Sequence, residues 1–274
     1  MSGRTEEYFR EIALRWLPLL TVVGDGVEMV CGLTGSDETA DQGYRGAMTT
    51  PVVLVHGWGG SFESTWQRSG FTELLRDASK PVIGIDLLGH GVAPKPHDPE
   101  AYADLTARVL DSMPDEPVDA VGFSLGAITL LQIACVQPGR FRKLVLAGIG
   151  GTLFERDDQA GERIAAAIEG TADSADVGSH VFAQYAHQAG NDPVALAAIM
   201  RRPRQRFTIE LLAGVTCQTL VTIGDKDFAG PGEPLANALP NAILKTLRGV
   251  DHFATPESFG FIDAVLEFLD ALPA

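Results

Sequence analysis

Short apolar strand-like runs alternate with helical patterns between residues 51 and 150. The helical patterns lie at about 68–78, at 99–113 and from residue 125 onward, where the stretch is apolar with no helix breaker. Each apolar run is short and continuous, which is typical of a strand that is buried on both faces. These runs are PVVLVHG (51–57), PVIGID (81–86), VDAVGF (118–123) and RKLVLAG (142–148). The alternation predicts an α/β protein with a mostly parallel sheet and helices on both faces.

The alternation stops after residue 150 and resumes near residue 215. The segment between them contains Ala-rich helical pieces and no good strand pattern. Strand patterns return in CQTLVTIGD (217–225) and AILKTLRG (242–249), and an amphipathic helix follows at 258–272. We therefore expect a core domain made of residues 1–150 and 215–274, with a helical insertion at residues 151–214.

The first fifty residues predict a hairpin and a loop. Two apolar runs flank Gly24-Asp25-Gly26, which indicates a hairpin over residues 19–33, and residues 35–50 are polar and Gly-rich. The N-terminus lacks the basic start of a signal peptide, and no run reaches the ~18 apolar residues of a membrane span. These features predict a cytoplasmic protein.

Composition and charge exclude several classes of partner. The chain has 274 residues, of which 45% are hydrophobic and 21% charged. This composition is ordinary for a soluble globular protein, and the chain is long enough to bury a large hydrophobic core. Its net charge of −15 repels nucleic acid and anionic lipid. Cys31, Cys135 and Cys217 are widely spaced in apolar runs, which is typical of buried reduced thiols. We expect a small-molecule substrate, no nucleic-acid or membrane partner, no metal, and a monomer or homodimer.

The sequence VGFSLGA (121–127) places Ser124 between two glycines, where a strand pattern ends and a helix pattern begins. A sharp strand-to-helix turn needs small neighbours, and it exposes the serine hydroxyl above the sheet edge. The following helix offers backbone N–H groups to a developing anion. This context favours a nucleophilic serine over a helix-capping one.

A serine nucleophile needs a base, and the base needs a carboxylate that orients it. His252 follows the last strand pattern, so we expect it at the sheet edge that carries Ser124. Asp225 and Asp227 both follow the strand pattern before it, and the residues alone leave the choice between them open.

Five motifs in order resemble the α/β-hydrolase fold superfamily over nearly the whole chain. They are HGWGG (56–60), DLLGHG (86–91), GFSLGA (122–127), GDKD (224–227) and GVDHF (249–253). The resemblance implies a mostly parallel sheet of the eight-stranded type, with residues 151–214 as a lid. It also implies that Ser124, Asp227 and His252 form a catalytic triad, with Asp225 as the second choice for the acid.

The resemblance further implies an oxyanion hole made by the backbone N–H groups of Trp58 and Leu125, and no cofactor. It makes His56 and His90 loop-stabilising residues rather than catalytic ones. Ala127 stands where many members have a second glycine, which is a small departure. The sharp strand-to-helix turn that carries the nucleophile is called the nucleophile elbow. A serine there, rather than an aspartate, disfavours dehalogenase and epoxide hydrolase activities.

The insertion would line the substrate pocket in such a fold. Phe154, Phe182 and Tyr185 are candidates for that lining, and so is Phe207, although all could instead form the small core of the lid. The run RRPRQR (201–206) could attract an anionic substrate, while arginines paired with surface acids are the simpler interpretation.

The function expected from these residues is a serine hydrolase that cleaves a carboxylic ester or thioester through an acyl-enzyme. Hydrolysis of a carbon–carbon bond in a diketone, or the perhydrolase chemistry of cofactor-free haloperoxidases, would use the same triad. A non-catalytic ligand-binding protein on the same fold is the alternative from another class.

Overall fold

The computed structural model describes residues 49–155, 157–172 and 177–272. Within them, six strands form one sheet in the order β2-β1-β3-β4-β5-β6, and every neighbouring pair is parallel. The strands are β1 (Val52–Val55), β2 (Val82–Ile85), β3 (Val118–Phe123), β4 (Phe141–Ala147), β5 (Gln218–Gly224) and β6 (Ala242–Leu247). The strand order reverses direction between β1 and β3, which in open parallel sheets is where ligands bind.

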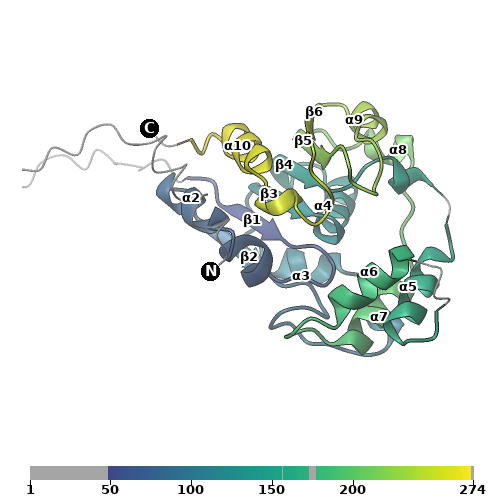
Figure 1. The fold of residues 1–274 in the computed structure, drawn as a ribbon. Helices are drawn as coiled ribbons and strands as arrows, with labels where there is room; N and C mark the ends of the chain where they lie inside the picture. The colour runs from purple at the N-terminus through teal and green to yellow at the C-terminus, as the bar shows by residue number, and fades with distance from the viewer. Residues whose placement is uncertain (1–48, 156, 173–176, 273–274) are drawn as a thin grey trace, which may run out of the picture. The chain divides into compact units, whose positions relative to one another are not determined.

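Helices cover both faces of the sheet (Figure 1). On one face, α3 (Thr106–Asp111), α4 (Leu125–Val136) and α9 (Glu233–Ala238) share a buried core with β1, and α4 is apolar almost all round. On the other face, the rings of Trp66, Phe71 and Phe261 pack together and join the two remaining helices of the core. Those helices are α2 (Phe71–Asp77) and α10 (Phe259–Phe268). The prediction of a parallel sheet with helices on both faces is confirmed.

Four further helices lie between β4 and β5 in the sequence. They are α5 (Ala160–Ile168), α6 (Val177–Ala186), α7 (Pro193–Arg201) and α8 (Ile209–Leu212). Helices α5, α6 and α7 pack on one another as a separate group beside the sheet (Figure 1). The described part of 151–214 contains no strand, as the sequence pattern predicted. We refer to residues 151–214 as the insertion.

The described residues also contain four short helical turns. They are η1 (Glu63–Gln67), η2 (Pro99–Tyr102), η3 (Gly151–Phe154) and η4 (Thr255–Glu257). The helices expected at 68–78 and 99–113 are shorter than predicted, because a turn with a different hydrogen-bond pattern precedes each of them. Among the described residues, no helix is long and apolar enough to cross a membrane.

Two sequence predictions lie wholly or partly outside the described residues. The hairpin at 19–33 is outside, so the count of eight strands stays a prediction. Cys31 is outside too, whereas Cys135 and Cys217 are free thiols that are half-buried rather than fully buried. Burial raises the pKa of Cys135 to about 11.

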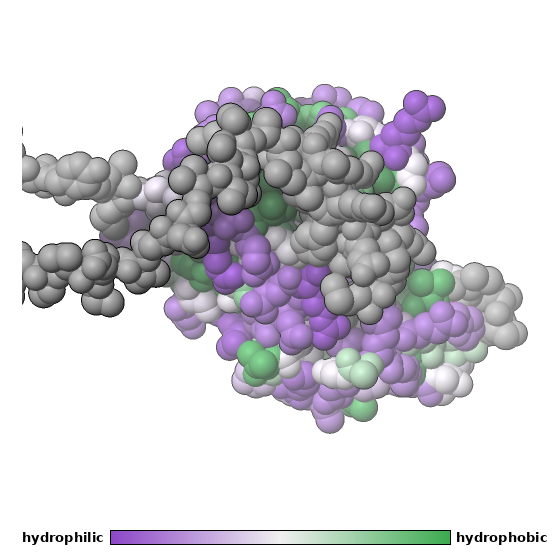
Figure 2. All heavy atoms as spheres, turned by 60° about the vertical axis from the view of Figure 1, so that its left-hand side comes forward, coloured by the Kyte–Doolittle hydropathy of each residue, from purple (hydrophilic) through white to green (hydrophobic). Residues whose placement is uncertain are grey.

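Hydrophilic residues predominate among the coloured residues of the face drawn in Figure 2, with hydrophobic ones in separate small patches.

The start of α4 packs directly against the end of β1. A Cβ atom added at Gly126 would lie 2.4 Å from the carbonyl oxygen of Val55 and 2.6 Å from that of His56. Both atoms belong to backbone that cannot move without disturbing the sheet. Only glycine therefore allows the helix to begin at this height above the strand.

Gly126→Ala should lower the free energy of unfolding by about 1–3 kcal/mol, because the methyl group overpacks a contact made by rigid backbone. Gly151→Ala is the matched control, since a Cβ there would have ordinary contacts at 3.6 Å, and it should change stability by less than about 0.5 kcal/mol. Urea unfolding of the three proteins measures the difference. Equal losses in both variants would show that the contact does not limit packing.

Candidate active site

Three side chains from the carboxyl end of the sheet form one chain of hydrogen bonds. Ser124 Oγ lies 3.0 Å from Nε2 of His252, and Nδ1 of His252 lies 2.9 Å from both carboxylate oxygens of Asp227. A carboxylate can only accept, so Nδ1 donates to Asp227 and Nε2 accepts the serine proton. His252 and Asp227 are buried, at 4% and 8% exposure. The structure thus brings together the three residues that the sequence singled out.

The backbone holds Ser124 in a conformation that a non-glycine residue rarely adopts. Its φ is 50° and its ψ is −112°. Its N–H donates to Ala147 O at 2.8 Å, and its carbonyl accepts from Ile128 N in the first turn of α4. Strain of this kind persists only where the surroundings enforce it, and it is typical of functional sites. The turn directs the hydroxyl away from the sheet and toward His252.

The structure distinguishes Asp225 from Asp227, between which the residues alone left the choice open. Asp227 Oδ1 also accepts from Ala229 N at 2.8 Å, which fixes the carboxylate beneath the imidazole. Asp225 is exposed, and its carboxylate accepts from Gly249 N at 2.7 Å. Asp225 therefore braces the loop before His252, whereas Asp227 contacts the imidazole itself.

Aromatic rings enclose the imidazole of His252. The ring centroids of Phe228 and Phe123 lie 4.2 and 4.9 Å from that of the imidazole. Phe253 packs at right angles to it at 5.5 Å. Phe228 and Phe253 each follow a triad residue directly in the sequence, so their position next to Asp227 and His252 was a signal that could have found them.

The loop after β1 runs close to Ser124, because a Cβ atom added at Gly57 would lie 3.3 Å from the Cβ of Ser124. Neither the N–H of Trp58 nor that of Leu125 donates a hydrogen bond to another described residue. His56 supports this loop from the core side: its Nδ1 donates to Gly57 O at 2.7 Å, and its Nε2 accepts from Leu87 N at 3.1 Å. Both ring nitrogens of His56 are thus occupied by backbone, as a loop-stabilising role requires.

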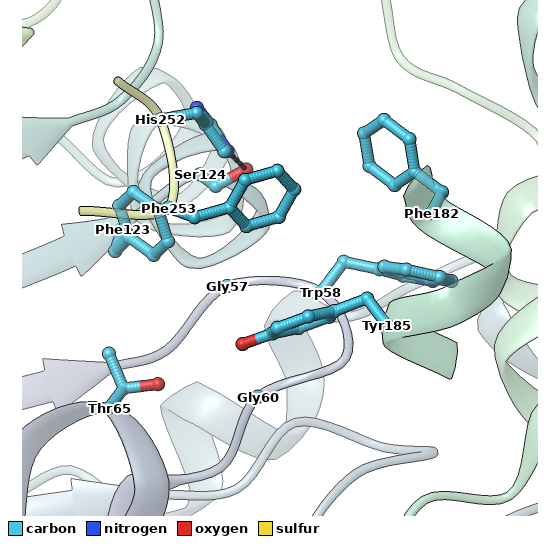
Figure 3. Close-up of a pocket in the computed structure, with 10 residues that line it drawn as sticks. All are labelled: Gly57, Trp58, Gly60, Thr65, Phe123, Ser124, Phe182, Tyr185, His252 and Phe253. Carbon is cyan, nitrogen blue, oxygen red and sulfur yellow. Dashed lines mark hydrogen bonds between the residues drawn. The ribbon is translucent and has the colours of Figure 1, made fainter. Parts of the chain in front are cut away.

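A small pocket opens beside Ser124 and His252 (Figure 3). Phe182 and Tyr185, two of the four candidate lining residues, reach it from α6, and Phe253, Thr65 and Phe123 join them from the core. About 20 Å³ remains for the centres of water-sized molecules, which is room for roughly one water. The free space directly beside Ser124 and His252 is therefore small.

Phe154 does not line this pocket, which corrects the prediction that it would. It lies in η3 and packs against the hydrophobic core. Phe207 is buried in the same core. Both therefore pack in the main hydrophobic core, which includes the strands, rather than in a separate core of the insertion. Their aromatic side chains alone could not distinguish pocket from core, since both environments are apolar.

The arginine run pairs with acids or with backbone rather than facing the pocket. Arg201 binds Glu162 and Glu169, and Arg206 binds Asp158. Arg202 donates to Ile199 O at 2.7 Å, and burial together with Arg204 lowers the pKa of Arg202 to about 10. None of these arginines is among the lining residues of the pocket.

Comparisons with known proteins agree with this fold. A sequence profile of the alpha/beta hydrolase fold family matches residues 50–177. Solved structures of a hydrolase from Pseudomonas aeruginosa and an enol-lactonase from Burkholderia xenovorans are similar, with TM-scores of 0.66 and 0.63. Their sequences are 24% and 18% identical to this chain; they cover 81% and 83% of it, and 91% and 94% of their own lengths. At such identities the likeness concerns the fold.

Two curated relatives are enzymes. A pimeloyl-[acyl-carrier protein] methyl ester esterase from Neisseria meningitidis is 37% identical over 111 residues, which is 39% of this chain and 40% of the relative. The chain therefore aligns with less than half the length of this relative. A 2-hydroxy-6-oxo-2,4-heptadienoate hydrolase from Pseudomonas putida is 29% identical over 81% of this chain and 89% of its own length.

The sheet topology, the elbow at Ser124, the profile match and the solved structures converge on one assignment. The chain has the α/β-hydrolase fold, and slightly under half of it matches the profile of that family.

Two buried histidines beside the site should make stability depend on pH. Burial lowers the pKa of His56 below its ordinary value of 6.5, and burial with the neighbouring His56 lowers that of His90 still further. The unfolded chain therefore takes up protons first as the pH falls below about 6.5. The free energy of unfolding should then decrease by up to about 1.4 kcal/mol per pH unit for each histidine.

His90→Asn, which can keep the donor to Leu88 O, should flatten this dependence between pH 6.5 and pH 5. Exposed His187 provides the control His187→Asn, which should leave the slope as in the wild type. Urea unfolding at several pH values gives the slopes. A His90 variant with an unchanged slope would contradict the assignment of a neutral, buried imidazole.

Proposed function

We propose that this protein is a serine hydrolase that cleaves a carboxylic ester or thioester of a small molecule. The observation that carries the proposal is the continuous hydrogen-bonded chain from Ser124 through His252 to Asp227, built on a strained turn beside a pocket. A protein that only binds a ligand on this fold does not need such a chain. The two curated relatives described above, an esterase and a hydrolase by name, support the same class of reaction.

In the proposed mechanism each residue of the site has one role. His252 Nε2 removes the proton of Ser124 as Oγ attacks the acyl carbonyl, and the imidazolium returns this proton to the leaving group. Asp227 holds the tautomer and stabilises the imidazolium. The N–H groups of Trp58 and Leu125 stabilise the oxyanion, and each such donor accounts for a few kcal/mol of barrier lowering. Water then attacks the acyl-enzyme with His252 as base.

The pocket favours an uncharged acyl group. Its lining is mostly aromatic, and apart from the triad its polar side chains include the hydroxyls of Thr65 and Tyr185. Burial, and secondly Glu257, raise the pKa of Tyr185, so its hydroxyl stays neutral and can donate. The ten lining residues include no lysine or arginine that could balance a substrate carboxylate. We therefore propose a short or aromatic neutral ester.

Carbon–carbon bond hydrolysis is the second candidate, because the heptadienoate hydrolase aligns with most of the chain. The name of that relative describes a carboxylate substrate, and a desolvated carboxylate requires a partner of opposite charge. The pocket of this chain lacks one, so the ester remains the preferred substrate. Perhydrolase activity, cytoplasmic location and the state of monomer or homodimer stay predictions from the sequence.

A fluorophosphonate probe should attach to Ser124 with a stoichiometry of about one per chain, because an activated serine attacks phosphorus as it attacks an acyl carbonyl. Intact-mass analysis of the wild type and of Ser124→Ala measures the labelling. Absence of label on the wild type, or equal label on the alanine variant, would exclude Ser124 as the nucleophile.

The two aspartates supply a matched pair for the same assay. Asp227→Asn should slow labelling by about 10³- to 10⁴-fold, because the amide favours the wrong tautomer of His252. Asp225→Asn makes the same chemical change in the same loop without contact to the imidazole, and its labelling rate should stay within about threefold of the wild type. Equal effects would contradict the assignment of Asp227 as the acid.

The preference for an uncharged acyl group can be tested with two esters of equal length. The enzyme should hydrolyse p-nitrophenyl butyrate with a kcat/KM at least about tenfold above that for the mono-p-nitrophenyl ester of succinate, since burying the extra carboxylate costs free energy. Arg201→Ala should leave this ratio unchanged. A preference for the succinate ester, or a ratio that depends on Arg201, would contradict the proposed substrate class.

A further inference from the structure

The insertion contacts the loop after β1 at three points. The indole Nε1 of Trp58 donates to Leu196 O in α7 at 3.2 Å. The side-chain amide of Asn191, which lies between α6 and α7, donates to Gly59 O at 2.9 Å. The ring of Tyr185 covers Gly59 so closely that an added Cβ would lie 2.6 Å from it. We call residues 57–60 the oxyanion loop, since Trp58 N is the proposed donor.

The orientation of Asn191 follows from its partners. Its Nδ2 also donates to Tyr185 O, the carbonyl of a residue in α6, at 3.1 Å. Both partners are carbonyl oxygens, which can only accept, so the two hydrogens of one amide group join the oxyanion loop to the insertion. The amide thus ties the carbonyl of Gly59 to that of Tyr185, whose side chain lines the pocket (Figure 3).

The oxyanion loop has a second set of supports on the core side. His56 donates to Gly57 O, and Gly60 N donates to Gly57 O at 3.1 Å. These bonds fix the beginning of the loop. The carbonyl of Gly59 and the side chain of Trp58 bond to the insertion instead. The peptide that carries the Trp58 N–H is the one whose carbonyl is Gly57 O, so it is bonded to His56 in the core. Through Gly60 N it is also bonded to the next-but-one peptide, whose carbonyl, Gly59 O, accepts from Asn191 of the insertion.

We propose that Asn191 is a positioning residue of the active site. It holds the oxyanion loop in the position from which Trp58 N can donate to the oxyanion. This proposal rests on the proposed serine-hydrolase function. Asn191 does not line the pocket and touches no reacting atom, so it acts through Gly59 and Trp58. Donors of an oxyanion hole stabilise the transition state more than the bound substrate. Loss of the anchor should therefore affect kcat far more than KM.

The sharpest variant is Asn191→Asp, which keeps the shape and places a carboxylate oxygen against two carbonyl oxygens. With p-nitrophenyl butyrate as substrate, kcat should fall about 10- to 100-fold, since a misplaced group costs up to this much, while KM changes less than about threefold. The affinity for a trifluoromethyl ketone, whose serine adduct carries an oxyanion, should fall by a similar factor.

Asn241→Asp is the matched control. The Asn241 amide donates to Thr216 O at 2.7 Å in an exposed loop that does not line the pocket, so this variant makes the same chemical change and should keep kcat and ketone affinity. Titration with the fluorophosphonate counts the active sites, so that kcat refers to folded enzyme. If Asn191→Asp yields no titratable enzyme, Asn191→Ala removes both bonds without adding repulsion and should show the same pattern more weakly.

The outcomes separate the two proposals. A selective loss of kcat and ketone affinity in the Asn191 variants supports the positioning role. If both Asn191 variants match Asn241→Asp per titrated site, the positioning role is wrong while the hydrolase function stands. A rise of KM alone would also overturn it, because the amide would then act on substrate binding. Wild-type protein that neither hydrolyses the ester nor takes the label would instead contradict the proposed function.

Discussion

The close approach of α4 to β1 is the contact on which the rest of the site depends. Gly126 lies against the carbonyl groups of Val55 and His56, so the helix that starts at Ser124 and the loop that starts at Gly57 share one backbone contact. Two consequences follow from it. The contact enforces the strained turn at Ser124, and it brings the oxyanion loop beside the serine hydroxyl. The parallel sheet then adds Asp227 and His252 from the ends of β5 and β6.

The insertion contributes in two ways to a site that the core builds. It supplies Phe182 and Tyr185, which narrow the pocket beside the triad, and it bonds to the oxyanion loop through Asn191 and Leu196. Within it, Arg201 pairs with Glu162 and Glu169, and Arg206 pairs with Asp158. The pocket is thereby left without a cation, which connects the charge pattern of the insertion to a neutral substrate.

The sequence predicted the parts of the molecule that depend on local patterns. Continuous apolar runs locate buried strands because both faces of a parallel sheet are covered, and the motifs at their ends locate Ser124 and His252. The choice between Asp225 and Asp227 needed the family resemblance, because both follow the same strand and only the turn after it decides which carboxylate meets the imidazole.

The insertion was less predictable for a physical reason. Its helices pack mainly on one another, so aromatic residues there serve either the pocket or the small core, and the pattern is the same for both. Phe182 lines the pocket and Phe154 packs against the core, although the sequence pattern around them does not distinguish the two environments. Asn191 bonds to Gly59 O, which is 132 residues away in the sequence, and to Tyr185 O near the end of α6. No local spacing indicates this pair of contacts.

The central claim is that Ser124 forms a covalent acyl-enzyme at the elbow. It can be tested by mixing the protein rapidly with excess p-nitrophenyl butyrate, quenching in acid and mapping the added mass by peptide mass spectrometry. The account predicts a butyryl group on Ser124 and, if deacylation is the slower step, a burst of nitrophenol of about one per active site. A butyryl group on another residue, or turnover without any acylated serine when deacylation is shown to be rate-limiting, would contradict it.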